Sequence, residues 1–285
     1  MSILSKLLYF LTQLIPFWLV YLCANILAFV LQHVVKYRVA VVRQNLKNAF
    51  PSYTNAALKE IEKKFYLNFC DVLLENLKLN SISKKTVRKR MKFLNPAVFS
   101  DLEETGKGVM LIGAHYNNWE WMALSLSTYL NDKMFSVYKP LNNTQSDRLM
   151  LNARARFGAN IIPMQQFPKV VLKNKNRGAV HLMIADQSPH RSKLDFFCAF
   201  LNQDTPVYLG AEKLMKAADL NLYFVEVHRV KRGFYEMKIV PLNEQSTNEK
   251  GQATRMHLSH LEKMIINQPE SWLWSHRRWK HSQKK

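Results

Sequence analysis

The chain has 285 residues, enough to bury a substantial core in one domain that carries a membrane anchor. Its 41 Lys and Arg residues against 21 Asp and Glu residues give a net charge of +20, which favours anionic partners such as phospholipid headgroups, nucleic acid or an acidic protein. The three cysteines, Cys23, Cys70 and Cys198, lack the paired spacing of a zinc site or a disulfide framework. We interpret them as reduced, as suits a cytoplasmic domain.

The first segment is apolar enough to enter a membrane. From Leu7 to Val35 there is no Asp, Glu, Lys or Arg over 29 residues, whereas about 20 helical residues cross a bilayer core. The segment lacks the short apolar block and cleavage site of a secretory signal, so we expect residues 1–35 to be retained as an anchor. Pro16 could split it into a surface helix and a span, or the whole could lie half-inserted. The alternative is an unusually apolar core helix of a soluble protein.

The charges around this segment predict its orientation. Only Lys6 precedes it, and four cations follow it closely: Lys36, Arg38, Arg43 and Lys47. By the positive-inside tendency, we expect residues 36–285 to form a domain on the cytoplasmic face of the membrane.

Two features follow the anchor. Apolar residues recur at helical spacing from Asn55 to Leu79, which predicts a long amphipathic helix. Residues 83–92 then read SKKTVRKRMK, with six basic side chains and no acid. This basic run is either a solvated helix face or a docking patch for acidic headgroups or an acidic protein.

Beyond the basic run, short apolar runs alternate with helical segments, which predicts an α/β fold with a mostly parallel sheet flanked by helices. The predicted strands are Val109–Ile112, Phe135–Tyr138, Asn160–Pro163, Val180–Ala185, Leu222–His228 and Phe234–Val240. The predicted helices are Trp119–Leu130, Thr144–Phe157, Gln166–Lys173, Val207–Ala218 and Thr254–Asn267. Because only a short turn separates the last two strands, we expect them to pair as an antiparallel hairpin at one end of the sheet.

Spacing alone does not identify a catalytic pair. The sequence holds four pairs in which an acid follows a histidine by five positions: His115/Glu120, His181/Asp186, His190/Asp195 and His257/Glu262. The last pair lies inside one predicted helix, where five residues turn the side chains about 140° apart. The second pair begins and ends a strand, so its members point to opposite faces. The third pair lies in a polar loop, where no predicted helix or strand would hold the two side chains together.

The first pair has a context that favours chemistry. His115 follows the strand VMLIGA at its carboxyl end, where open α/β sheets place their ligands. Glu120 falls in the first turn of the next helix, and a strand-to-helix corner could let its carboxylate accept the imidazole N–H. The other ring nitrogen would then take a proton from a hydroxyl as a general base. The alternative is a histidine that caps a turn beside a surface glutamate.

Several blocks of the sequence resemble one family in order along the chain. These blocks are RQNLKNAFP (43–51), GAHYNNWEW (113–121), IADQSP (184–189), FFCAFLNQDT (196–205) and PESWLWSHRRWK (269–280). They are similar to the HX4E and later motifs of the late acyltransferases of lipid A biosynthesis, the lauroyl and myristoyl transferases within the lysophospholipid and glycerolipid acyltransferase superfamily. The resemblance covers nearly the whole chain, and the last block is the most specific.

The resemblance implies roles for residues in the matching blocks. His115 would be the general base and Glu120 its orienting partner. Arg154 or Arg156 matches a family arginine near the site, which could bind a phosphate of the acceptor or the oxyanion of the tetrahedral intermediate. A plain surface arginine is the alternative.

Further residues of these blocks are expected to bind substrate. Asp186 and Gln187 end a strand on the same edge as His115, and Asp186 could orient the arginine or a sugar hydroxyl, or simply form a turn. Asn118 and Arg277 are expected to contact substrate too. Residues 188–191 depart from the acid and glycine usual in the family, which leaves the acceptor open.

The resemblance also implies the reactants. The donor would be an acyl thioester, with acyl carrier protein favoured over coenzyme A, and the acceptor a hydroxyl of a lipid A-type glycolipid at the inner membrane. We expect no metal and no cofactor besides the thioester, and an anionic membrane surface rather than nucleic acid as a partner. A lysophospholipid, an aminolipid or another glycolipid is the alternative acceptor. A non-catalytic basic membrane-binding protein is the alternative of another class, and a metal hydrolase is weaker still.

The C-terminal block mixes indoles and cations. Trp272, Trp274 and Trp279 alternate with Arg277, Arg278 and Lys280, a mixture typical of membrane interfaces and of nucleic-acid surfaces. Given the anchor, we expect this tail at the interface, with at least one of the first two tryptophans in the core.

Overall fold

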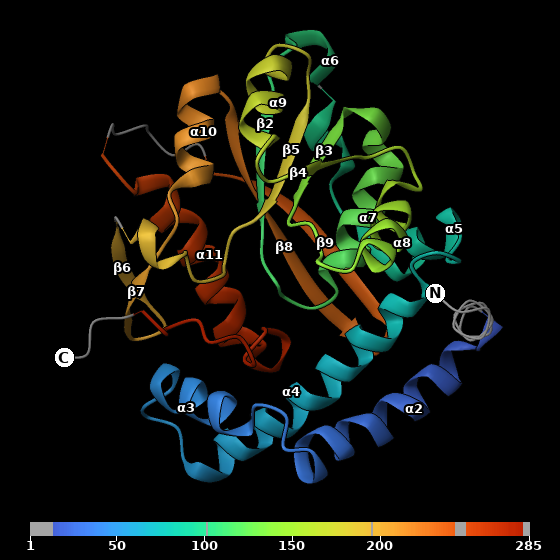
Figure 1. The fold of residues 1–285 in the computed structure, drawn as a ribbon, viewed down its shortest axis with the longest axis vertical. Coiled ribbons are helices and arrows are strands. Elements are labelled where there is room, and N and C mark those ends of the chain that lie inside the picture. Colours follow the sequence, from blue (N-terminus) through green and yellow to red (C-terminus); the bar gives the residue numbers. More distant parts are fainter. Residues whose placement is uncertain (1–13, 101, 195, 243–248, 282–285) are drawn as a thin grey trace.

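The computed structural model describes residues 14–281, except positions 101, 195 and 243–248, as a seven-stranded sheet flanked by helices (Figure 1). The strands are β1 (Met91–Phe93), β2 (Val109–Gly113), β3 (Met134–Tyr138), β4 (Asn160–Pro163), β5 (Val180–Ile184), β8 (Asn221–Lys231) and β9 (Phe234–Pro241). Their order is β1-β9-β8-β2-β5-β3-β4, and every neighbouring pair is parallel except β8 and β9. The predicted fold class is therefore confirmed.

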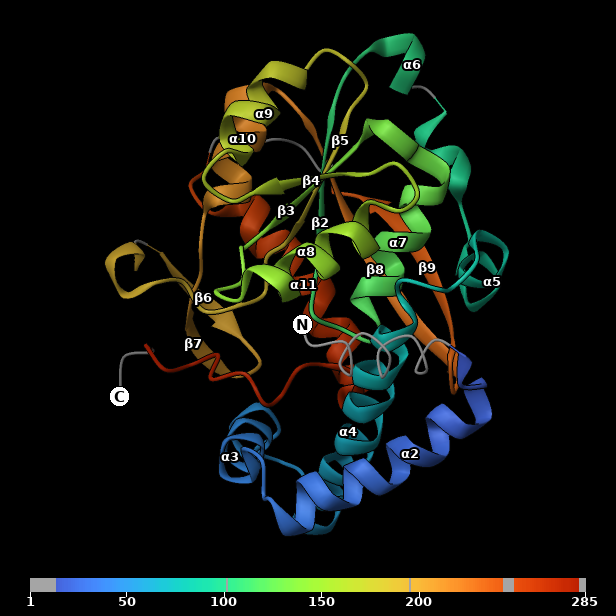
Figure 2. The ribbon, with the colours of Figure 1, turned by 45° about the vertical axis from the view of Figure 1, so that its right-hand side comes forward.

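Helices cover both faces of this sheet (Figures 1 and 2). On one side lie α7 (Trp119–Leu130) and α8 (Thr144–Ala155), and on the other lie α9 (Phe167–Asn174), α10 (Gly210–Ala218) and α11 (Gln252–Asn267). The short helices α5 (Lys84–Arg90) and α6 (Leu102–Thr105) complete this part. All five residues of β2 are buried, as expected of a central strand covered on both faces.

Three helices lie below the carboxyl end of β2. They are α2 (Phe17–Phe29), which continues through the π-helical turn Val30–Val34, α3 (Val39–Ala49) and α4 (Asn55–Glu75). The Thr54 hydroxyl caps α4 by accepting the Ala57 N–H. Figure 2 shows α2 running beside α4, with α4 between α2 and the sheet. The part of the apolar segment before residue 14 lies outside the described residues.

Two details of the predicted topology were wrong or missing. The β8–β9 hairpin forms, but it is not the edge of the sheet, because β1 pairs outside β9 in parallel. A second hairpin, β6 (Phe197–Phe200) with β7 (Gln203–Pro206), stands apart from the main sheet. The strands that the sequence missed, β1, β6 and β7, have only three or four residues each, so their local apolar pattern is weak.

Candidate active site

The ends of two adjacent parallel strands create the site. In the register of β2 and β5, Gly113 lies opposite Ile184, so the residues two positions beyond each strand meet at the same sheet edge. These residues are His115 and Asp186. A side chain at Gly113 would have to displace the end of the Ile184 side chain, since an added Cβ would lie 2.8 Å from its Cδ1.

His115 and Asp186 form a tight hydrogen-bonded pair. His115 Nδ1 lies 2.6 Å from Asp186 Oδ1, and the His115 backbone N–H donates to Asp186 Oδ2 at 3.0 Å. Trp272 Nε1 donates to the same Oδ2 at 2.9 Å. The Asp186 side chain is 3% exposed and that of His115 is 20% exposed. The imidazole can therefore be reached from solvent while its carboxylate partner cannot.

Each member of this pair shifts the pKa of the other. Burial alone would raise the pKa of Asp186, but the charge of His115 and the hydrogen bonds from His115 and Trp272 lower it to about 2. Burial alone would lower the pKa of His115, but the charge and hydrogen bond of Asp186 outweigh this and raise it above its usual value. Asp186 is thus ionised at neutral pH, and it accepts the Nδ1–H of His115 whenever the imidazole has lost its other proton.

That tautomer leaves the lone pair of His115 Nε2 available as a base. The Gln187 amide nitrogen lies 3.3 Å from Nε2 and can donate to it. Because Gln187 is exposed, an incoming hydroxyl can replace its amide without opening the core. Trp119 packs edge-on against the imidazole, with ring centroids 5.1 Å apart, and limits its rotation.

Glu120 does not orient His115, contrary to the sequence-based prediction. It lies in the first turn of α7 as expected, but Arg154 holds its carboxylate through two hydrogen bonds, Nε to Oε2 at 2.8 Å and Nη2 to Oε1 at 2.5 Å. Asp186 occupies the position on His115 Nδ1 instead. The prediction that Asp186 orients Arg154 or Arg156 was wrong for the same reason, since Glu120 binds Arg154 and Asp186 binds His115. Its alternative, a contact with a sugar hydroxyl, stays a prediction.

Arg154 is partly exposed and has one guanidinium nitrogen that Glu120 does not bind. Its side chain is 28% exposed, and Glu120 engages Nε and Nη2. Its third nitrogen, Nη1, has no hydrogen-bond partner among the residues that the structure describes. Glu120 raises and Arg154 lowers the pKa of His115 through space, so the ion pair lies within electrostatic reach of the base.

Three other predicted site residues lie away from this centre. Asn118 is fully buried, caps α7 by accepting the Trp121 N–H and donates to Glu75, so it does not contact substrate and that prediction was wrong. Arg156 donates to the Leu79 carbonyl and is not the arginine that pairs with Glu120. Arg277 is exposed, and its binding role stays a prediction.

The remaining histidine–acid pairs do not meet in the part of the chain that the structure describes. His181 packs in the core, between the rings of Phe135 and Phe167, away from Asp186. His257 is buried on α11, while Glu262 accepts the Leu201 N–H. Asp195 lies outside the described residues.

Much of the C-terminal block packs into the protein, which confirms that at least one of its first two tryptophans lies in the core. Its place at a membrane interface stays a prediction. Trp272, Trp274 and Arg278 are at most 2% exposed. Trp272 forms a β-bridge with Tyr116, and the Asn117 N–H donates to the Ser271 carbonyl. The block thus holds the loop after β2 and supplies a donor to Asp186. The sequence analysis missed both roles. The local signal for the second is that a buried tryptophan needs an acceptor for its indole N–H.

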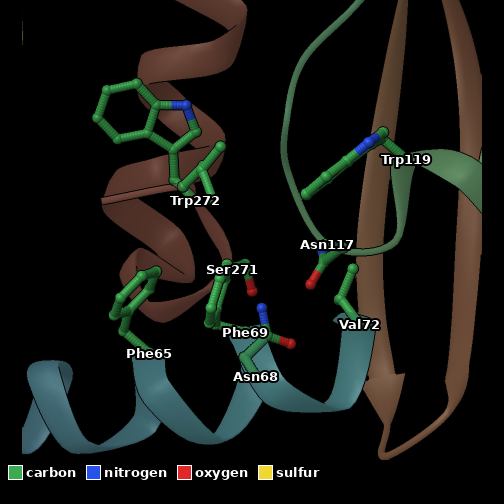
Figure 3. Close-up of a pocket in the computed structure, with 9 residues that line it drawn as sticks. Phe65, Asn68, Phe69, Val72, Asn117, Trp119, Ser271 and Trp272 are labelled. Atoms are coloured by element: carbon green, nitrogen blue, oxygen red, sulfur yellow. The ribbon is translucent and has the colours of Figure 1, made fainter. Parts of the chain in front are cut away.

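A small pocket lies beside the site, between α4 and the loop after β2 (Figure 3). Apolar side chains surround it, including Phe65, Phe69 and Trp119, but Asn117 and Ser271 also line it. The Asn117 Oδ1 and Ser271 Oγ atoms are buried and have no hydrogen-bond partner among the described residues.

Comparisons with known proteins show the family to which the chain belongs. The model of the bacterial lipid A biosynthesis acyltransferase family matches residues 3–281. The chain belongs to this family. It is an acyltransferase, and the resemblance in the sequence blocks is thereby confirmed.

Curated relatives agree with this assignment. A lipid A biosynthesis acyltransferase of Haemophilus influenzae is 24% identical over 234 residues, which are 81% of this chain and 72% of that protein. A lipid A biosynthesis palmitoleoyltransferase of Escherichia coli is 25% identical over 249 residues, 86% of this chain and 79% of that protein. A lipid A biosynthesis acyltransferase of Shigella flexneri has the same identity and coverage.

Proposed function

We propose that this acyltransferase moves a fatty acyl chain from a thioester to a hydroxyl of a lipid A-type glycolipid at the cytoplasmic face of the inner membrane. The observation that supports this most strongly is the His115–Asp186 pair, with a 2.6 Å hydrogen bond on Nδ1 and a solvent-accessible imidazole. The choice of a lipid A-type acceptor is supported by the family match and by the names of the relatives.

The reaction needs a base that takes up and returns one proton, and groups that stabilise the imidazolium and the oxyanion that form. His115 Nε2 takes the proton of the acceptor hydroxyl as its oxygen attacks the thioester carbonyl, and Asp186 stabilises the imidazolium that forms. The carbonyl oxygen becomes an oxyanion, and Arg154, aligned by Glu120, supplies a cation for it or for an acceptor phosphate. When the tetrahedral intermediate collapses, the carbon–sulfur bond breaks and the thiolate leaves with the proton that His115 returns.

A direct test is mass spectrometry of membrane lipids from cells lacking this protein. The expected result is a lipid A species that lacks one acyl chain, restored by the wild-type chain and not by His115→Ala. An unchanged lipid A together with altered phospholipids or aminolipids would contradict the proposed acceptor while leaving the acyltransferase assignment intact.

We propose acyl carrier protein as the donor, because α5 presents a basic face to an acidic carrier. Lys84, Lys85 and Lys89 are exposed. Arg88 is bound instead to Thr128 at the end of α7, and Arg90 packs on Phe17. Only the three lysines therefore test docking without breaking internal contacts.

Changing these three lysines to Glu should raise the KM for acyl carrier protein steeply and leave any slow reaction with a coenzyme thioester nearly unchanged, because charge steering acts on the acidic carrier. A matched control changes Lys173, Lys175 and Arg177 to Glu, three exposed cations at the opposite end of the sheet. Equal effects of both triple variants, or equal effects on both donors, would show that α5 is not the dock.

A further inference from the structure

One side of α2 is apolar and has no partner in the described chain. Four side chains at intervals of three or four residues form this outer face, with exposed fractions of 69%, 49%, 61% and 61%: Trp18, Leu22, Ile26 and Phe29. The segment Phe17–Val34 is long and apolar enough to cross a membrane. Its length alone does not tell whether it does so.

The other side of α2 is bound to the body of the protein. Val20, Ala24 and Ala28 are buried on α2. Ala24 and Ala28 belong to the same core cluster as α4 side chains such as Phe65. Small residues at this face let the two helices approach closely. Helices packed in this way have axes about 8–10 Å apart.

Polar residues along α2 also bind charged groups of the domain. The three contacts are Tyr21 Oη to Glu75 Oε1 at 2.8 Å, Arg232 Nη2 to Asn25 Oδ1 at 2.8 Å, and Gln32 Nε2 to Glu62 Oε1 at 3.1 Å. Eleven residues separate the first contact from the last, which corresponds to roughly 16 Å along a helix axis. The segment is thus fixed to the domain near both of its ends.

These contacts are incompatible with a docked helix that crosses the bilayer. If α2 spanned while bound, Glu62 and Glu75 would lie at two depths of the hydrocarbon, together with the exposed lysines Lys59, Lys63 and Lys64 on α4. Each charge at the centre of a bilayer costs about 2.5–3.5 kcal/mol or more. Detaching α2 from α4 instead would expose its buried face and leave the buried carboxylates without these donors.

We propose that the anchor is monotopic: α2 lies in the plane of the membrane interface, outer face inserted, with α4 stacked on its cytoplasmic side. Cations at both ends of α2 complement an anionic bilayer. At the first end the Arg90 guanidinium lies 3.4 Å from the Phe17 ring centroid. Lys36 follows at the other end, exposed, and no acid occurs before Glu60 in the chain.

The test measures the depth of α2 in a membrane, independently of the proposed chemistry. Single spin labels replace Trp18, Leu22, Ile26 or Phe29 in full-length protein that carries Cys23→Ser and Cys198→Ser. The protein is reconstituted in vesicles of phosphatidylglycerol and phosphatidylethanolamine. Power saturation with oxygen and with a nickel chelate then gives the depth of each label, and a label at Lys173 is the aqueous control.

An in-plane helix predicts four similar, shallow depths, about 5–10 Å below the headgroup boundary. A spanning helix predicts depths that differ by roughly 10 Å or more between positions 18 and 29, because the rise over eleven residues is about 16 Å. That second profile would overturn the proposal. Labels that reach neither lipid nor nickel would overturn it as well, and would show that a second copy of the chain covers the outer face.

Discussion

At the scale of single residues, the two acids near His115 have different tasks. Asp186 binds the imidazole directly, whereas Glu120 binds Arg154 and reaches His115 only through space. A general base must be neutral to act, so the acid limb of the pH–rate profile should follow the pKa of His115. Because Asp186 raises that pKa, the limb should lie above the usual value of a histidine.

Asp186→Asn should separate these tasks. Losing the carboxylate removes the main cause that raises the pKa of His115, so the acid limb of kcat/KM should move to lower pH, while kcat falls about 10²–10⁴-fold because the imidazolium is no longer stabilised. Glu120→Gln is the matched control, since it keeps the Asp186 contact and should move the limb less. A larger shift for Glu120→Gln than for Asp186→Asn would contradict this division.

Trp272 should act as a positioning residue. Trp272→Phe removes the N–H that donates to Asp186 Oδ2, and a hydrogen bond to a charged group contributes about 1.5–3 kcal/mol. With one donor fewer, the carboxylate is more basic and holds the imidazolium more strongly. The acid limb should therefore move to higher pH, with lower kcat and little change in KM. Lower thermal stability with an unmoved pH profile would assign Trp272 a packing role alone.

At the scale of elements, one buried carboxyl joins four parts of the fold. Glu75 of α4 is fully buried and accepts hydrogen bonds from Tyr21 of α2, Asn118 at the start of α7 and Tyr235 of β9. Burial raises its pKa to about 7, although the hydrogen bonds from Asn118 and Tyr21 oppose the shift.

This shift predicts a pH-dependent stability. Because the folded-state pKa lies above the ordinary glutamate value of 4.5, Glu75 stabilises the fold fully below pH 4.5, and this contribution is lost as pH rises through about 7. The shift corresponds to about 3 kcal/mol. Urea unfolding at pH 5 and pH 8 should therefore show a decline in wild-type stability that Glu75→Gln largely removes, since glutamine can keep the hydrogen bonds without ionising. An equal decline in both proteins would locate the titrating group elsewhere.

At the scale of the whole molecule, α4 lies between α2 and the sheet (Figure 2), so an α2 helix that lies in the membrane interface, as proposed, would put α4 between the membrane and the sheet. Deleting residues 1–35 would remove the contacts of α2 with Glu75, Arg232 and Glu62. The truncated chain would expose a buried face, so loss of membrane binding in it would be confounded with loss of stability.

Substitution of the outer face avoids this problem. Leu22→Glu/Ile26→Glu changes two exposed side chains, and each contributes about 1.5–3 kcal/mol when buried in an apolar medium. Binding to anionic vesicles should fall at least about a hundredfold, with an unchanged unfolding temperature. Lys173→Glu/Lys175→Glu, the same two introduced acids on an exposed surface far from α2, is the control. Undiminished sedimentation of the Leu22/Ile26 variant with vesicles would show that another surface binds the membrane.

The sequence by itself determined the elements whose signal is local. Apolar periodicity located α4, α7 and the four strands from β2 to β5 within a few residues, because each pattern is complete within its own segment. Likewise the motif around His115 and the block ending at Lys280 indicated the family without any contact between them being known.

Only the tertiary structure decided which groups meet. The exchange of partners between Asp186 and Glu120 follows from the register of β2 against β5, which joins residues 71 positions apart, and no local pattern specifies such a register. The same holds for α2: composition made it apolar, but its docking depends on Tyr21, Asn25 and Gln32 meeting charged groups on α4 and the β8–β9 hairpin. Burial of those groups is a property of the packed molecule, because a charge is costly or harmless according to what surrounds it.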